Sequence, residues 1–374
     1  MKIIERGTIY QNTENQSRTR CAYFPSLARL SDGRILCTFQ VATEKSGADE
    51  TLRLCESKDE GQTWRLLAFD PNPVFNGVLG GFRIAHIVET KPNELFMATN
   101  WMDRSDPSLP ISHPETAGCL EMKLLCFRST DGGASWSDAE DLSEYSPFDQ
   151  PEVSGPIIAL KEPGNLLIPM ENQKQYYDPE PINEKAFCLI SRDYGKSWND
   201  WAMICDRFPD YKQWCNRIAV LPESGNLVCF SWTFDEKTQE DLPIHIIHGS
   251  PDGTKWSAPV STGVEGQLST PFPLDESTLL MGYVHRHQPA SIRLRKSADG
   301  GKNWDADDEL IIHEGEKNAA SDGRGGSIED YYKFLASYTF GWNPMLQLKD
   351  GRVLMAYFAG TGEAMNIHRI TIES

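Results

Sequence analysis

Short apolar runs separated by small polar turns recur along the whole chain. In each case an apolar run is followed by a turn rich in Gly, Asn or Asp and then by a second apolar run. Apolar runs of this length, bounded by turn residues, are typical of a β-hairpin. The pattern occurs six times, at residues 30–36, 90–96, 161–167, 222–228, 274–280 and 349–354. The chain is therefore predicted to be all-β.

A second repeat, Ser-x-Asp-x-Gly-x-x-Trp, is independent of the first. In such a sequence the Asp side chain can accept backbone N–H bonds within a tight turn, and the Gly permits the turn conformation. The Trp can cover the base of the hairpin. The repeat indicates a fold made of similar units arranged in series. It occurs at residues 57–64, 129–136, 191–198 and 297–304, and one residue shorter at 250–256.

Together the two repeats predict a propeller. Each of the first five hairpins is followed by the Asp-containing motif, so each unit has four strands and six units make six blades. The last unit lacks the motif and has only one further strand, at residues 365–371. Residues 2–10 are expected to supply its fourth strand, because this pairing closes the ring and covers the open edges. Residues 1–374 are thus predicted to form a single six-bladed β-propeller domain.

The topology also predicts where a functional site lies. Strands alternate in direction within a blade, so the hairpin turns and the Asp-containing turns share one end of the molecule. The long irregular loops share the opposite end, and loops of this length on a rigid scaffold usually carry function. They comprise about residues 41–51, 99–121, 171–185 and 231–242.

The residues expected around the axis at that end are polar or aromatic, which suits a sugar. Carboxylates can transfer protons, Arg can bind a carboxylate through two hydrogen bonds, and aromatic rings can stack on the apolar faces of sugars. The candidate catalytic residues are Glu44, Asp49, Glu152 and Glu171. The candidate binding residues are Arg83, His86, Trp214, Arg217, His285, Arg286, His287 and Trp342.

Composition narrows the classes of partner. The formal net charge of −18 argues against nucleic acid, whose phosphates are bound by clustered Lys and Arg. A local cationic pocket can still take an anionic substrate. No apolar stretch approaches the length that spans a membrane, and no P-loop, dinucleotide or zinc spacing is present. Neither a membrane partner nor a metal or other cofactor is expected.

The cysteines and the first residues predict a compartment. Nine cysteines are scattered without metal-ligand spacing, which favours reduced thiols in the protein core. The chain begins without an apolar run followed by small residues, so no signal peptide is visible. The sequence therefore predicts a cytoplasmic protein.

The repeated Ser-x-Asp-x-Gly-x-x-Trp motif resembles the Asp-boxes of the sialidase (neuraminidase) superfamily, and the resemblance covers nearly the whole chain. Residues 23–27 resemble the family's opening motif, and residues 154–169 resemble its third blade. Residues 43–57 resemble the loop that carries the acid/base Asp, which implies this role for Asp49, with Glu44 as the second candidate. Residues 342–351 resemble the segment that holds the nucleophilic Tyr.

The chain departs from this family at several of the matched positions. Tyr23 and Phe24 occupy the place of the Arg in the opening motif, and Trp342 occupies that of the nucleophile. Residues 214–216 lack the activating Glu. Of the three Arg residues in the carboxylate clamp, only the third is matched, by Arg286. Because the sialidase reaction needs the clamp and an activated Tyr, the sequence predicts an altered chemistry.

The leading hypothesis is a sialidase-like carbohydrate-active enzyme, an exo-acting glycoside hydrolase on an acidic or small glycan. Asp49 or Glu44 would donate the proton, and Glu152 or Glu171 would be the second carboxylate.

Two alternatives stay open. The first is a polysaccharide lyase in which His86, or the His285–His287 pair, removes a proton next to a uronate carboxylate that Arg83 or Arg217 neutralises. The second is a propeller that binds glycans without catalysis, since a fold does not fix a function. The sequence does not predict the oligomeric state.

Overall fold

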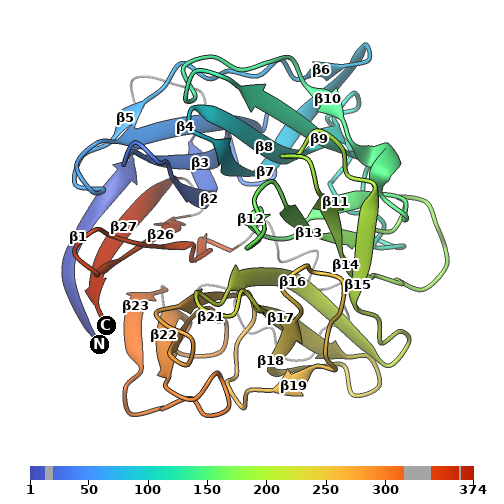
Figure 1. Cartoon of the computed structure of the whole chain (residues 1–374). Helices are drawn as coiled ribbons and strands as arrows, with labels where there is room; N and C mark the ends of the chain where they lie inside the picture. The colour runs from blue at the N-terminus through green and yellow to red at the C-terminus, as the bar shows by residue number, and fades with distance from the viewer. Residues whose placement is uncertain (13–19, 316–337, 362–363) are drawn as a thin grey trace.

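The protein is built from β-strands around a common centre, in a propeller-like arrangement (Figure 1). The computed structural model describes residues 1–12, 20–315, 338–361 and 364–374. Within these ranges the only helical element is a short 3₁₀ helix, η1 (Ser143–Tyr145). The prediction of an all-β fold is therefore confirmed.

Four of the sheets are formed by consecutive strands of the chain. The first has the order β10-β9-β8-β7-β6, with β6 Val74–Phe75, β7 Val78–Lys91, β8 Glu94–Asp103, β9 Met122–Ser129 and β10 Glu140–Asp141. The second comprises β11 Pro151–Val153, β12 Ile158–Ala159, β13 Leu166–Asn172, β14 Ala186–Ser191 and β15 Asp200–Cys205. The third comprises β16 Tyr211–Val220, β17 Leu227–Asp235, β18 Glu240–Gly249 and β19 Val260–Ser261. The fourth comprises β20 Ser269–Pro273, β21 Leu279–His285, β22 Ser291–Ser297 and β23 Leu310–Glu314.

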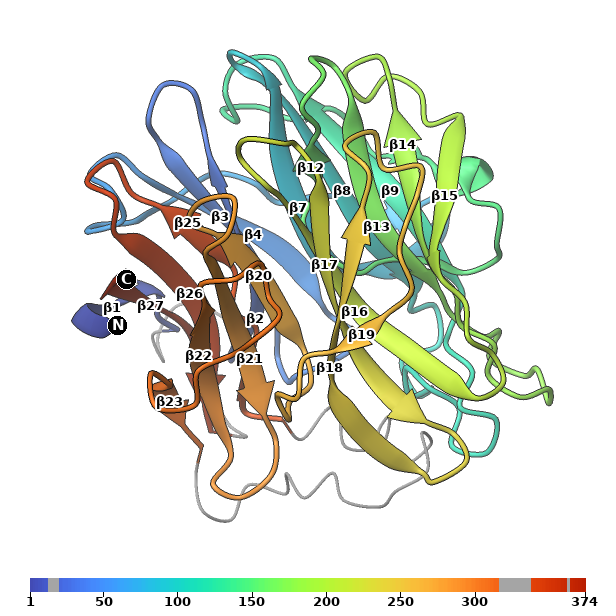
Figure 2. The same cartoon turned by 60° about the horizontal axis from the view of Figure 1, so that its bottom comes forward.

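A nine-stranded sheet joins the two ends of the chain. Its strands are β24 Phe340–Gly341, β25 Met345–Gln347, β26 Val353–Gly360, β27 Met365–Glu373, β1 Lys2–Tyr10, β2 Cys21–Arg29, β3 Ile35–Ala42, β4 Thr51–Ser57 and β5 Arg65–Leu66. The N-terminal strand β1 pairs antiparallel with β27, the pairing that the sequence predicted. A single parallel pair, Cys21 with Met365, connects β2 to β27. The two termini lie next to each other in both views (Figures 1 and 2).

The core lies between the faces of neighbouring sheets. All eight residues of β3 and all six residues of β14 are buried, because both faces of these strands are covered. One cluster brings Leu36 and Leu54 together with Phe82, Met97 and Leu125 of the following sheet. Strands buried on both faces read as continuous apolar runs. This packing explains why the hairpin pattern in the sequence is made of such runs.

The repeated motif forms the same hydrogen-bonded turn at four positions and a modified turn at the fifth. At residues 191–198, Ser191 Oγ accepts the backbone N–H of Gly195 at 2.9 Å and donates to Asp193 Oδ1 at 2.8 Å. The Asp193 carboxylate also accepts the N–H of Ser197 at 2.9 Å and its hydroxyl at 2.7 Å. Gly195 has a φ of 78°, a conformation that favours glycine. Matching serine bonds occur at Ser57, Ser129 and Ser297, and in modified form at Ser250.

All nine cysteines are free thiols, and eight of them are buried. Among the described residues, no helix has the length and apolar character needed to cross a membrane.

Ser191→Ala should lower the free energy of unfolding by about 1–3 kcal/mol, because it leaves the buried N–H of Gly195 without an acceptor. Urea unfolding would measure the change. Ser197→Ala is the matched control: its hydroxyl donates to the same Asp193 but is only partly buried, so a smaller loss is expected. Equal losses for the two variants would contradict the assignment.

Candidate functional site

A cavity of about 560 Å³ opens at the end of the strands opposite the repeated turns. In the nine-stranded sheet, Ser57 of the first repeated turn pairs with Ile35 at the start of β3. Thr51 at the other end of β4 pairs with Val41 near the end of β3. The loop 43–47, which contributes to the cavity, continues from that second end. The cavity therefore lies at the end where the sequence placed the functional site.

Four residues with unusual backbone angles line the cavity. Phe24, Ile84, Cys215 and Trp342 all have positive φ angles, of 53°, 44°, 52° and 63°, and all four line the cavity. The first three lie at register shifts in β2, β7 and β16, where one strand carries an extra residue. A β-bulge redirects a side chain, and non-glycine residues rarely adopt these angles. The inner strands thus accept local strain to build the cavity wall.

A pair of carboxylates forms one wall. Glu152 of β11 and Glu171 of β13 are directly opposed in the antiparallel register, and both line the cavity. Side chains opposed in this way are close neighbours on one face of the sheet. Gln173 Nε2 donates to Glu152 Oε2 at 2.7 Å, and the Cys215 N–H donates to Glu171 Oε2 at 3.1 Å. Each carboxylate is therefore fixed by a separate donor.

The surroundings keep a proton on this pair. Burial raises the pKa of Glu171 well above its usual value, and the charges of Glu152 and Glu184 raise it further. Burial also raises the pKa of Glu152, but Arg83 and the bond from Gln173 oppose this increase. Two like charges this close cannot both ionise easily. The proton is therefore favoured on Glu171, and the negative charge on Glu152.

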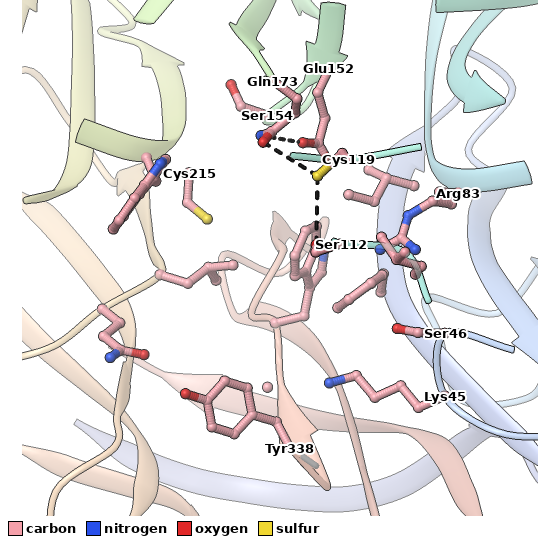
Figure 3. Close-up of a pocket in the computed structure, with 18 of the residues that line it drawn as sticks. Lys45, Ser46, Arg83, Ser112, Cys119, Glu152, Ser154, Gln173, Cys215 and Tyr338 are labelled. Carbon is pink, nitrogen blue, oxygen red and sulfur yellow. Dashed lines mark hydrogen bonds between the residues drawn. The ribbon is translucent and has the colours of Figure 1, made fainter. Parts of the chain in front are cut away.

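Cationic groups form the opposite side of the cavity. Figure 3 shows Lys45 and Tyr338 across the cavity from Glu152 and Gln173. The Arg286 guanidinium lies 3.8 Å from the centre of the Tyr338 ring, and its Nη1 donates to the Phe340 carbonyl at 3.0 Å. Burial lowers the pKa of Lys45 well below its usual value, and the charges of Arg286 and Arg83 lower it further. The three cations are thus close enough to influence one another.

Arg83 is positioned by a buried ion network behind the cavity. Glu50 has a fully buried side chain, and its Oε1 lies 3.3 Å from Arg83 Nη1 and 3.1 Å from Arg104 Nη2. The Tyr23 hydroxyl donates to Glu50 Oε2 at 3.4 Å, and Gln40 Nε2 also donates to this oxygen. A buried carboxylate is tolerated only when it is paired and hydrogen-bonded in this way.

An aromatic and cationic stack forms the floor. The Trp342 ring lies 4.6 Å from that of Phe24, and the Arg217 guanidinium lies 4.0 Å from the Trp342 ring centre. Arg217 is 1% exposed, and burial lowers its pKa to about 10. A guanidinium against an indole face is a favourable cation–π arrangement. Arg217 therefore supports the floor from below and does not face the cavity.

The loop 104–118 closes one side of the cavity through contacts with the loop that follows β13. Thr116 Oγ1 donates to the Tyr176 carbonyl at 2.5 Å, and Lys174 Nζ donates to the Thr116 carbonyl at 2.8 Å. A Cβ on Gly118 would lie 2.0 Å from the Gln175 carbonyl oxygen, so glycine is required for this close approach. The two loops therefore form one continuous wall.

Seven of the residues selected from the sequence line this cavity. They are Glu44, Arg83, Glu152, Glu171, Trp214, Arg286 and Trp342. They come from different sheets, so only the folded chain brings them together.

The other five selected residues do not line it. Asp49 turns back onto its own loop, where it accepts the N–H of Thr43 at 3.1 Å. His86 is buried and bonded to Ser26 Oγ at 2.8 Å, and burial lowers its pKa to about 3. Arg217 lies below the floor, as described above. His285 and His287 pack against each other outside the cavity lining, with ring centres 5.7 Å apart.

Sequence reasoning missed Lys45, Glu50, His113 and Tyr338. Lys45 directly follows Glu44 in a loop that was already selected, so its position was an available signal. Glu50 falls within the same loop, but nothing in the sequence shows that it pairs with Arg83 and Arg104. His113 and Tyr338 belong to irregular segments whose paths no pattern predicts.

In the described part of the chain, no three His, Cys, Asp or Glu side chains are grouped so that they could hold a metal ion.

The sequence of this chain is similar to those of sialidases. No protein-family model matches the sequence. A segment of 84 residues is 31% identical to Sialidase-2 of Mus musculus, covering 20% of this chain and 22% of that protein. A longer match to a sialidase of Bacteroides fragilis is 22% identical over 343 residues, covering 83% of this chain and 58% of that protein. The chain thus spans less than two thirds of either protein.

Solved structures agree over the whole chain. A protein of unknown function from Dyadobacter fermentans aligns with a TM-score of 0.71 and 19% identity, covering 99% of this chain and 98% of its own. A Hadza microbial sialidase aligns with a TM-score of 0.68 and 15% identity, covering 98% of this chain and 68% of its own. The intramolecular trans-sialidase of Ruminococcus gnavus, in complex with oseltamivir carboxylate, aligns with a TM-score of 0.65 and 12% identity, covering 100% of this chain and 98% of its own. The chain therefore has a sialidase-like fold.

Glu50→Gln should lower the free energy of unfolding by about 3–5 kcal/mol, because Arg83 and Arg104 would stay buried without their carboxylate. Chemical denaturation would measure the loss. Asp70→Asn is the control, since Asp70 pairs with Arg53 on the surface with 81% of its side chain exposed. Little change is expected there, and a similar loss in both variants would refute the role given to Glu50.

Proposed function

We propose that the chain is a six-bladed propeller with five Asp-boxes and that it acts as a glycoside hydrolase. The nine-stranded sheet counts as two blades, because only the Cys21–Met365 pair joins its β1/β24–β27 half to its β2–β5 half. The five repeated turns are the Asp-boxes. The similarity to sialidases supports a function on glycans.

The observation that carries the proposal is the Glu152–Glu171 pair in the cavity wall. Glycoside hydrolysis generally uses two carboxyl groups, one that protonates the leaving oxygen and one that acts as base or nucleophile. Environments that separate the pKa values of two neighbouring carboxyls assign these roles. Glu171, which retains its proton, is the general acid. Glu152, whose negative charge Arg83 and Gln173 stabilise, is the second carboxylate.

The substrate is an acidic or small glycan whose terminal sugar enters the cavity. Lys45 and Arg286 lie on the side opposite the carboxylate pair, so an anionic group of the sugar is favoured there. Trp342 and Phe24 supply an apolar floor. The wall formed by loop 104–118 limits the cavity to one terminal unit, which makes the enzyme exo-acting.

A non-catalytic glycan-binding role is the second candidate. It is favoured by the presence of Trp342 where the family holds its nucleophilic Tyr, because the same cavity can bind a sugar without reaction. The lyase alternative has less support, since His86, His285 and His287 all lie outside the cavity lining.

Turnover of a panel of 4-methylumbelliferyl glycosides tests the activity, using N-acetylneuraminic, glucuronic and galacturonic acids with neutral sugars for comparison. Glu171→Gln should lower kcat roughly 100-fold or more, because the amide cannot donate the proton. The wild-type rate should fall as pH rises through the raised pKa of Glu171, where the acid loses its proton. It should also fall at low pH, where Glu152 becomes protonated.

Glu44→Gln and Asp49→Asn are the matched variants in loop 43–50. Both should retain turnover if the pair in the sheet is the catalytic one. Loss of turnover in either, with Glu171→Gln active, would move the acid to that loop. Binding of the sugar without turnover by the wild type would favour the non-catalytic candidate.

Glu171→Gln should also stabilise the protein. A carboxyl group whose pKa is raised on folding supports the folded state below its unfolded pKa of about 4.3. It loses that contribution as pH rises through the folded pKa. Glu171→Gln should therefore raise the thermal midpoint at pH 8 more than at pH 4, while turnover is lost. An unchanged or lowered midpoint at pH 8 would show that the carboxyl is structural.

A further inference from the structure

His113, in loop 104–118, has one ring nitrogen committed to its own loop. Its Nδ1 lies 3.2 Å from the backbone nitrogen of Glu115 and 3.2 Å from that of Thr116. Both of these groups are N–H donors, so Nδ1 must carry a lone pair. A neutral imidazole has a single N–H, which must then be at Nε2. The loop itself therefore sets the tautomer of this ring.

The remaining N–H of His113 is available to a ligand. The residue is half-buried and lines the cavity, next to the exposed Pro114 at its mouth. Among the described residues, no hydrogen-bond partner of Nε2 is found. Tyr176 and Tyr177 contact the ring edge-on, with centres 5.0 and 5.5 Å away, and hold its orientation. A fixed donor at the mouth selects for an acceptor oxygen.

A second, independent feature lies beside it. Tyr177 is 70% exposed, more than any other large hydrophobic side chain in the described part of the chain. It does not pack into a core, but its ring is fixed by edge-on contacts with His113 and with Tyr176, 4.9 Å away. An exposed aromatic ring in a fixed orientation offers an apolar face at little entropic cost on binding.

We propose that His113, at the edge of the cavity, and Tyr177, beyond its lining, form a second sugar subsite for the unit that follows the terminal sugar. The sugar stacks on Tyr177, and one of its hydroxyl or ring oxygens accepts the His113 Nε2–H. The unit is a neutral hexose, because the negative charge of Asp106 acts on the neighbouring Tyr176 ring more strongly than the opposing Arg104 and disfavours a second acidic sugar. The assignment rests on the proposed function in placing the terminal sugar in the cavity.

His113→Asn and Tyr177→Ala test the subsite. Asn can place an oxygen where Nδ1 lies and accept the same two N–H groups, so the loop is kept while the outer donor is lost. Each variant should raise KM roughly 3- to 10-fold for the reactive acidic sugar linked to galactose, with little change in kcat. The aryl glycoside of the same sugar and inhibition by the free monosaccharide should be unaffected. Tyr177→Phe, which keeps the ring, should match the wild type.

The proposal is overturned if KM for the disaccharide is unchanged in both variants, or if inhibition by the free monosaccharide weakens equally. A long-range ¹H–¹⁵N spectrum of the His113 imidazole tests separately whether Nε2 carries the proton. A proton found on Nδ1 instead would contradict the proposed hydrogen bond to the sugar. If the wild type hydrolyses nothing, calorimetric titration with 3′-sialyllactose and a glucuronic-acid-terminated disaccharide separates the two failures. If the wild type binds a disaccharide more tightly than its acidic monosaccharide, and the two variants lose this difference, the subsite is supported although the hydrolase activity is not. If the wild type binds both sugars equally, the subsite proposal is overturned.

Discussion

Pairing of the N-terminal strand β1 with the C-terminal strand β27 is the constraint on which the rest of the structure depends. It places both ends of the chain in one nine-stranded sheet, to which β2 is joined by the Cys21–Met365 pair. A sheet edge left open at this point would expose unpaired backbone groups. With the ends joined, the inner strands are arranged around one centre, and their ends together line the cavity.

Strain at those ends converts a regular scaffold into a site. Regular strands would alternate their side chains between the faces of each sheet. The bulges at Phe24, Ile84 and Cys215 break this alternation and turn side chains toward the axis. The Cys215 bulge also aims its backbone N–H at Glu171. The strained backbone at Cys215 therefore also helps to position Glu171 of the carboxylate pair.

The sequence predicted the fold better than the site. The hairpin runs and the Ser–Asp turns depend on local physics, so the strands and turns could be predicted directly, whereas the β1–β27 pairing followed from the need to cover the open sheet edges. Glu152 and Glu171 were selected because the topology places the ends of β11 and β13 near the axis. Asp49 was selected both from the topology and from the family resemblance, but its carboxylate accepts hydrogen bonds from its own loop. Glu50 could not be recognised, because its role depends on Arg83 and Arg104, which are distant in the sequence.

The carboxylate pair is difficult to explain as a structural feature. Like charges directly opposed across two strands destabilise a sheet, and burial increases that cost. An amide would fit the same wall without the cost, as Gln173 shows by its bond to Glu152. The chain keeps two acids there and surrounds them with a Cys215 N–H, an Arg83 charge and the Gln173 amide, which act differently on each. These unequal environments support the proposed role in proton transfer, since stability alone would favour removing one of the two acids.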